Sequence, residues 1–138
     1  MSPAADLMDE TNPAGQPVVL LVEDEVLIRL ATADHLRASG FKVVEAGTAA
    51  EAQELILAGL KVDVVFSDIT MPGEIDGVGL AGWLQTIGAT TPVVLASGVP
   101  RALESAKQAC TNVRAIAAKP YDHDEIAAQI RAIVGPQG

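Results

Sequence analysis

The sequence predicts an α/β domain built on an open, doubly wound parallel sheet of five strands with five helices. Short β-branched or apolar runs alternate along the chain with segments of helical length. Several of the longer segments also carry apolar residues at helical spacing. Strands that alternate with helices form parallel sheets covered on both faces, and right-handed crossovers make such a sheet doubly wound. The expected strands are Val18–Val22, Phe41–Glu45, Val64–Ser67, Val93–Ala96 and Arg114–Ala117.

The helical segments differ in how clearly their apolar residues repeat. Residues 122–134 show the single stripe of an amphipathic helix. Residues 25–38 have no clean stripe, so we expect that helix from composition and from Gly40 as its end. Thr48 is a candidate N-cap for the helix after the second strand. The expected core-facing stripes are Ile126, Ile130, Ile133 and Val134; Leu80, Leu84 and Ile87; Leu103, Ala106 and Cys110; and Ala49, Ala52 and Ile56.

Length and charge limit the kinds of partner. The chain has 138 residues, of which 49% are hydrophobic, enough for one domain with a single core. We expect residues 1–17 to be a flexible tail and residues 18–135 to be the domain.

With 18 acidic and 9 basic residues the net charge is -9. This charge argues against nucleic-acid or membrane-surface binding. Without an apolar run of membrane length or a signal peptide, the cytoplasm is the expected location.

Polar side chains follow four of the expected strands. In sheets of this kind ligands bind outside the carboxyl ends of the strands. Glu23 and Asp24 come directly after the first strand and Asp68 after the third. Ser97 follows the fourth strand, and Lys119 stands just past the fifth. Each of these residues alone would pass for an ordinary turn or surface residue. Together they predict one site.

The charges of this predicted site point to a metal ion. Three neighbouring carboxylates cannot all stay ionised without a compensating cation, and Lys119 supplies only one positive charge. Oxygen ligands without nearby His or Cys favour a hard divalent ion, commonly Mg²⁺. A cation with open positions, a lysine and a hydroxyl together form a receptacle for a phosphoryl group. Asp68 is placed to be the nucleophile that forms an acyl phosphate.

The remaining polar and aromatic residues predict packing rather than chemistry. His35 and His123 lack the spacing of metal ligands, so we expect them at the surface or in helix packing. Trp83 lies outside the stripe of its own helix, which predicts a half-exposed residue or part of a partner surface.

Four motifs in order resemble the receiver domain of two-component response regulators. They are LVEDE (21–25), VFSDITMPGEIDG (65–77), VVLASG (93–98) and AAKPY (117–121). The resemblance runs from about Pro17 to Val134. It implies the strand order 2-1-3-4-5 of the flavodoxin-like and receiver folds. It also implies phosphorylation of Asp68 by a histidine kinase or a phosphotransfer protein.

The same resemblance assigns roles to single residues. Asp24 and Asp68 would bind Mg²⁺ directly and Glu23 through water, with the backbone carbonyl of Thr70 as a further ligand. Ser97 would bond a phosphoryl oxygen, and Lys119 would pair with the phosphoryl group. The Lys119–Pro120 bond would be cis.

Two features depart from the family pattern. Family members usually carry Tyr or Phe three residues before the lysine, where this chain has Ile116, and an isoleucine cannot make the same ring movement. Tyr121 could substitute, although a ring packed in the last strand–helix loop is the simpler interpretation. The loop MPGEIDG (71–77) is one residue longer than the common form, with turns expected at Met71–Gly73 and Asp76–Gly77.

We therefore expect a single-domain receiver, because only four residues follow Val134. It would catalyse only its own phosphorylation and dephosphorylation, and it would signal through the face formed by residues 101–134. The chain would be a monomer or a transient homodimer. The alternative is an interaction module of the same fold that works without phosphorylation. A metal-dependent phosphohydrolase would need an acidic residue where Thr70 stands.

Overall fold

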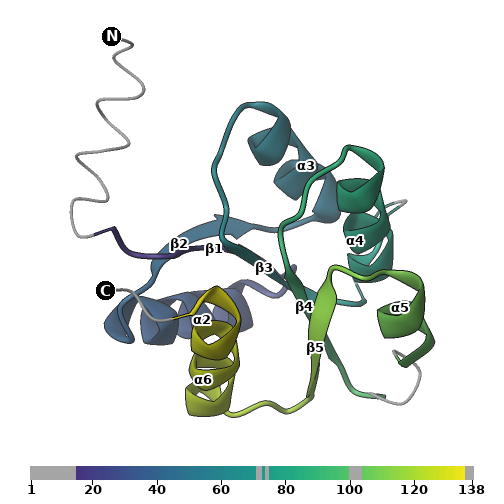
Figure 1. The fold of residues 1–138 in the computed structure, drawn as a ribbon. Helices are drawn as coiled ribbons and strands as arrows, with labels where there is room; N and C mark the ends of the chain where they lie inside the picture. Colours follow the sequence, from purple (N-terminus) through teal and green to yellow (C-terminus); the bar gives the residue numbers. More distant parts are fainter. Residues whose placement is uncertain (1–14, 71–72, 74, 100–103, 136–138) are drawn as a thin grey trace, which may run out of the picture.

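A computed structural model gives the structure of the chain and describes residues 15–70, 73, 75–99 and 104–135. Five parallel strands form one sheet in the order β2-β1-β3-β4-β5, which confirms the predicted fold class and strand order (Figure 1). The observed bounds lie within one residue of the expected ones. The strands are β1 (Val18–Val22), β2 (Lys42–Ala46), β3 (Val64–Asp68), β4 (Val93–Ser97) and β5 (Val113–Ala118).

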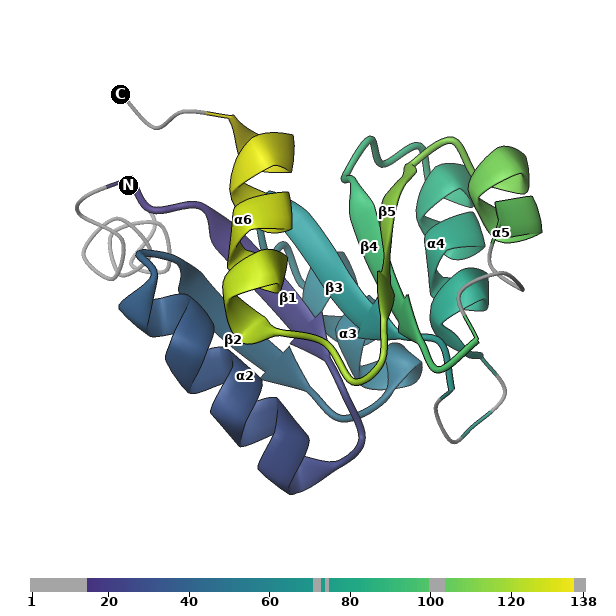
Figure 2. The ribbon, with the colours of Figure 1, turned by 90° about the horizontal axis from the view of Figure 1, so that it is seen from below.

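A helix follows every strand, and the helices cover the two faces of the sheet (Figures 1 and 2). Two of them pack on one face, and the others lie on the opposite face. The first pair is α2 (Val26–Ala38) and α6 (His123–Val134). The others are α3 (Ala49–Leu57), α4 (Gly77–Thr86) and α5 (Glu104–Ala109). This arrangement is the doubly wound architecture that alternating elements predict.

Alternate residues of the buried strands point into two separate cores. On the side of α2 and α6, Val19 and Leu21 of β1 pack with residues such as Leu36 and Ile126. On the opposite side, Leu20 and Val22 pack with residues of α3 and α4. Both faces of the central strands are therefore apolar. Polar groups are left to the strand ends, where the backbone leaves the sheet.

Within the described residues, three helices begin at side-chain caps. The Thr48 hydroxyl accepts a hydrogen bond from Glu51 N at 3.1 Å, which confirms the predicted N-cap of α3. Asp76 caps α4 by accepting from Gly79 N at 2.8 Å. Asp122 caps α6 in the same manner through Asp124 N at 2.7 Å. Each cap fixes the point at which the chain turns from the carboxyl edge of the sheet into a helix.

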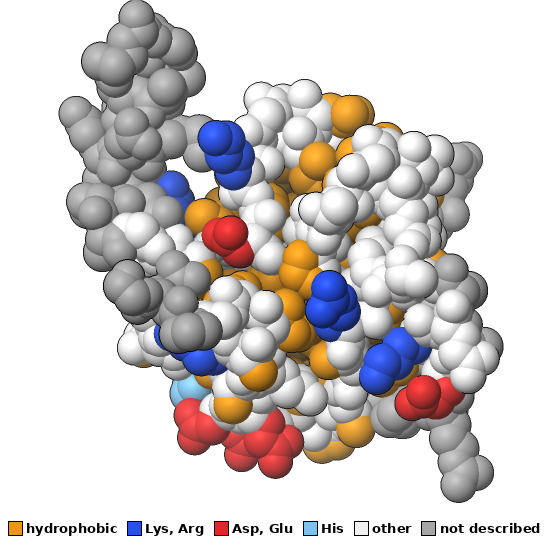
Figure 3. Space-filling view, viewed as in Figure 1, with side chains coloured by type: hydrophobic (Ala, Val, Ile, Leu, Met, Phe, Trp, Pro, Cys, Tyr) orange, Lys and Arg blue, Asp and Glu red, His pale blue; other side chains and the backbone are white. Residues whose placement is uncertain are grey.

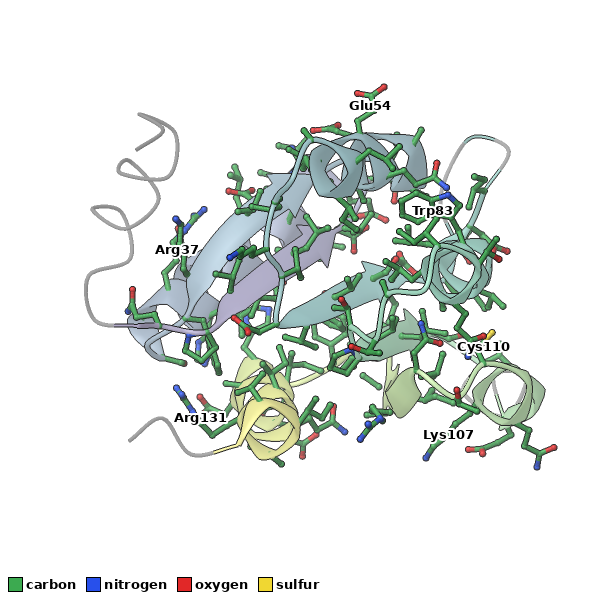
Figure 4. The ribbon with its side chains drawn as sticks, turned by 45° about the horizontal axis from the view of Figure 1, so that its top comes forward. Arg37, Glu54, Trp83, Lys107, Cys110 and Arg131 are labelled. Carbon is green, nitrogen blue, oxygen red and sulfur yellow. The ribbon has the colours of Figure 1, made fainter. Side chains whose placement is uncertain are left out.

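The predicted stripe of α4 is right for two of its three residues. Leu80 and Leu84 are fully buried, whereas Ile87 is 44% exposed. The prediction for Ile87 is wrong because α4 ends at Thr86 and Gly88, at φ +77°, turns the chain away. Trp83 is half-buried where α4 packs beside α3 (Figure 4).

Several expectations fall outside the described residues. They concern residues 1–14 of the predicted tail, the turn at Met71–Pro72, and the side chains of Leu103 and Ala106. Within the described ranges, no helix combines the length and the hydropathy needed to cross a membrane.

Candidate functional site

The predicted site residues meet at the carboxyl edge of the sheet. Asp68 and Ser97 are the last residues of β3 and β4, and Glu23 and Lys119 directly follow β1 and β5. Backbone hydrogen bonds extend the ladders past the strand ends, such as Glu23 N to Ala46 O at 3.0 Å and Lys119 N to Ser97 O at 2.8 Å. The loops are therefore held in register where the polar side chains begin.

Three carboxylates face one another within this edge. Glu23, Asp24 and Asp68 each offer an oxygen, and these oxygens all lie within 4.8 Å of one another. Glu23 and Asp68 are buried, at 2% and 7% exposure, while Asp24 is open to solvent. Such an all-oxygen set with one solvent-facing ligand fits a hard divalent cation that keeps some of its water.

Lys119 provides the positive charge of the site. Its ammonium donates a hydrogen bond to Oδ2 of Asp68 and lies 3.8 Å from Oε1 of Glu23. Partial burial alone would lower the pKa of Lys119, but the hydrogen bond and charge of Asp68 outweigh it and raise the pKa above its usual value. Lys119 therefore stays protonated at neutral pH.

Glu23 is buried beside Lys119, and its burial disfavours the charged form of its carboxyl. Burial raises the pKa of Glu23 to about 7, although the hydrogen bond from Glu25 N to its Oε2, at 3.2 Å, opposes the shift. The charge of Asp68 adds to the increase. A carboxyl in this state gains much from a nearby cation, because the cation favours its ionised form. The donor set thus fits a bound Mg²⁺.

Thr70 and Gly77 both lie close to Asp68, one beside its carboxylate and the other beside its backbone oxygen. Thr70 N donates to Oδ1 of Asp68 at 3.2 Å, so the amide of Thr70 helps to orient the carboxylate. A Cβ at Gly77 would lie 2.5 Å from the backbone oxygen of Asp68. Only glycine lets the start of α4 approach β3 so closely. Sequence reasoning treated Gly77 as a turn residue and missed this contact.

Ser97 and the loop after β5 complete the edge. The Ser97 hydroxyl accepts from Val99 N at 2.9 Å. The Lys119–Pro120 bond is cis, as the resemblance implies. A groove of about 440 Å³ opens beside Lys119, between the start of α2 and this loop. It is lined by Glu25, Ile28, Lys119, Pro120, Tyr121 and His123.

Tyr121 packs as predicted, and it also touches α2. Its half-buried ring packs edge-on against the ring of Phe66, with 5.4 Å between the ring centroids. Phe66 lies on β3, two residues before Asp68. Its hydroxyl lies 3.4 Å from the hydroxyl of Thr32, and burial raises the pKa of Tyr121. Tyr121 therefore connects the strand that carries Asp68 to α2.

The two histidines lie together at the seam of α2 and α6. Their ring centroids are 5.3 Å apart, and Nε2 of His123 lies 3.1 Å from the Thr32 hydroxyl. Nε2 of His35 lies 2.9 Å from Oδ1 of Asp124, in the first turn of α6. Figure 3 shows acidic side chains gathered next to a histidine on the lower left of this face. Both histidines act in helix packing, which agrees with the prediction.

Comparisons with known proteins find relatives over most of the chain. Residues 19–131 match the response regulator receiver domain family. Protein PetR of Rhodobacter capsulatus is 32% identical over 121 residues, covering 88% of this chain and 50% of PetR. The chain thus spans about half the length of this curated relative.

Two solved structures share the fold. The receiver domain of the Francisella response regulator 1452 has a TM-score of 0.79 at 23% identity, covering 86% of this chain and 97% of that one. Response regulator TrrA from Thermotoga maritima, solved in complex with Mg²⁺–BeF, has a TM-score of 0.74 at 23% identity. That match covers 86% of this chain and 99% of TrrA.

Proposed function

Because the chain belongs to the response regulator receiver domain family, we propose that Asp68 accepts a phosphoryl group in a Mg²⁺-dependent reaction. The phosphoryl donor would be a histidine kinase or a phosphotransfer protein. The observation that carries the proposal is the position of Asp68, which lies among two other carboxylates and under the ammonium of Lys119. This arrangement can hold a cation and a phosphoryl group on the same carboxylate.

Glu23, Asp24 and Asp68 would hold the cation, with the Thr70 carbonyl as a backbone ligand. Asp24 and Asp68 would bind it directly and Glu23 through water. Bound Mg²⁺ supplies positive charge for the oxygens of the transferring phosphoryl group. The complex of Thermotoga maritima TrrA with Mg²⁺–BeF supports this choice of metal for the fold.

Asp68 would act as the nucleophile. One carboxylate oxygen forms a bond to phosphorus while the bond from phosphorus to the donor nitrogen breaks. The donor nitrogen keeps the electron pair and takes up a proton. Lys119, already bonded to Asp68, would then pair with the phosphoryl oxygens, and the Ser97 hydroxyl would leave Val99 N to bond another. Attack of water on phosphorus would later release phosphate and restore the carboxylate.

The signal would leave through the face formed by residues 101–134, of which the structure describes 104–134. Since Ile116 stands at the usual aromatic position, Tyr121 is the ring best placed to follow changes at Lys119. A donor that reaches Asp68 would also meet the start of α2, where Val26 and Leu27 are 55% and 82% exposed. These exposed apolar side chains support the docking of a donor protein.

The test is intact-protein mass spectrometry after incubation with a small phosphodonor, with and without Mg²⁺. Wild type should gain one Mg²⁺-dependent phosphoryl adduct, and Asp68→Asn should gain none. Asp34→Asn is the matched control, since Asp34 lies on α2 with an 83% exposed side chain. An adduct that persists on Asp68→Asn would overturn the assignment of the site.

Ile116 favours a second candidate, a receiver-like module that binds its partner without phosphorylation. Such a module would bind equally well with and without Mg²⁺ and phosphodonor, and Asp68→Asn would leave that affinity unchanged. Steady turnover of a chromogenic phosphate ester would instead indicate a phosphohydrolase.

A further inference from the structure

Arg29 of α2 reaches back to the loop that carries the two acidic residues. Its Nη1 donates a hydrogen bond to the backbone oxygen of Glu23 at 2.9 Å. This oxygen belongs to the peptide that joins Glu23 to Asp24. Because a peptide is planar, holding its oxygen also fixes the direction in which Asp24 leaves the strand.

The guanidinium is itself held from the opposite side. Its Nε lies 3.4 Å from Oε1 of Glu45 on β2, and both side chains are about four-fifths buried. The other oxygen of Glu45 accepts from Arg37 at 3.1 Å, beside β2 (Figure 4). Gly47 leaves space for the guanidinium, since a Cβ there would lie 3.3 Å from Nη1. Arg29 therefore bridges β2 and the acidic loop.

The contact from Arg29 completes the hydrogen bonds of Glu23. Its amide is bonded to Ala46 O at 3.0 Å, and its Oε2 accepts from Glu25 N at 3.2 Å. The bond from Arg29 satisfies its carbonyl. Without Arg29, a carbonyl beside a buried carboxylate would lose its partner, and the loop would turn to find another.

We propose that Arg29 is a positioning residue that sets the Glu23–Asp24 peptide for cation binding. The proposal rests on the proposed function, because it concerns the same Mg²⁺ site. Residues that orient metal ligands typically change metal affinity by about 10- to 100-fold when they are replaced. We expect Arg29→Gln to weaken Mg²⁺ binding about 10-fold.

The direction of this change separates positioning from simple electrostatics. Arg29 carries a positive charge close to the acidic loop, so removing that charge alone would strengthen the binding of Mg²⁺. Loss of positioning predicts weaker binding. Arg29→Lys keeps the charge but has a single ammonium in place of the planar fork, so it should also weaken binding, to a smaller degree.

The experiment measures Mg²⁺ dissociation constants by calorimetry and amide hydrogen exchange by NMR on the metal-free full chain. In Arg29→Gln the Glu25 amide should exchange several-fold faster, because its acceptor on Glu23 is no longer fixed. Arg37→Gln is the matched control, since Arg37 binds the same Glu45 and the Val43 carbonyl. It should keep the wild-type Mg²⁺ affinity within about two-fold.

The Mg²⁺ affinities of the two variants test whether Arg29 positions the acidic loop. Wild-type or tighter Mg²⁺ binding by Arg29→Gln would overturn the proposal, as would an equal weakening in Arg37→Gln. If wild type itself bound no Mg²⁺, the proposed function would be contradicted. Exchange of the Glu25 amide in the metal-free protein would then still support or overturn the positioning role.

Discussion

Replacing Glu23 with Gln should remove much of the pH dependence of stability that the metal-free protein shows between pH 5 and pH 8. Glu23 is 2% exposed, and burial raises its pKa from 4.5 to about 7. When a carboxyl has a higher pKa in the folded state than in the unfolded state, its protonated form stabilises the folded state. Its contribution is complete below about pH 4.5 and is lost as the pH rises through about 7.

The size of the effect follows from the shift. Each pKa unit corresponds to about 1.4 kcal/mol, so the full shift of Glu23 corresponds to about 3 kcal/mol. Between pH 5 and pH 8 the free energy of unfolding should fall by roughly 2 to 3 kcal/mol because of this residue. Lys119 adds little in this window, because its raised pKa keeps it protonated throughout.

Urea unfolding at pH 5, 6, 7 and 8 in a chelator measures the effect directly. The difference in unfolding free energy between wild type and Glu23→Gln isolates Glu23 from the other titrating groups. In Mg²⁺ the wild-type curve should flatten, because the cation stabilises the ionised carboxylate and binds only the folded chain. Parallel pH profiles for the two proteins in the chelator would refute the reasoning, since Glu23 would then have an ordinary pKa.

Three further changes test the site. Gly77→Ala should destabilise the protein by about 1 to 3 kcal/mol in urea unfolding and disturb Asp68, since its Cβ would lie 2.5 Å from the Asp68 oxygen. Gly82→Ala, in the same helix with free space around it, should instead leave stability equal or higher. Lys119→Ala should retain Mg²⁺ binding by calorimetry and lose the phosphorylation-dependent shifts in NMR spectra outside the site; unchanged shifts would contradict its role. The Tyr121 ring signals should move on phosphorylation of wild type, and a static ring would exclude Tyr121 from the switch.

Local sequence patterns were sufficient for most of the fold. The alternation of strand-length and helix-length segments predicts a parallel sheet, and Thr48 caps α3 as its side chain predicts. Ile87 shows where this reasoning stops. Its spacing from Leu84 suits a helix stripe, but α4 ends one residue earlier and leaves Ile87 44% exposed. A stripe records apolar spacing and does not say where a helix loses contact with the sheet.

The placement of the principal residues of the candidate site could also be predicted, because a parallel sheet brings the carboxyl ends of its strands to one edge. Position at a strand end is sufficient to predict that four side chains meet there: Glu23, Asp68, Ser97 and Lys119. The supporting contacts could not be predicted in this way. Arg29 belongs to a helix with no clean apolar stripe, and its partner Glu45 comes from a neighbouring strand 16 positions later in the chain.

The sequence by itself therefore determined the fold class and the place of the carboxylates and the lysine at one edge of the sheet, since these depend on periodicity and on position relative to a strand end. The tertiary structure alone decided the raised pKa of Glu23, the close approach of Gly77 to Asp68 and the bond from Arg29 to the acidic loop. These three features depend on burial and on distances between segments far apart in the chain. Those quantities exist only after the helices have packed against the sheet.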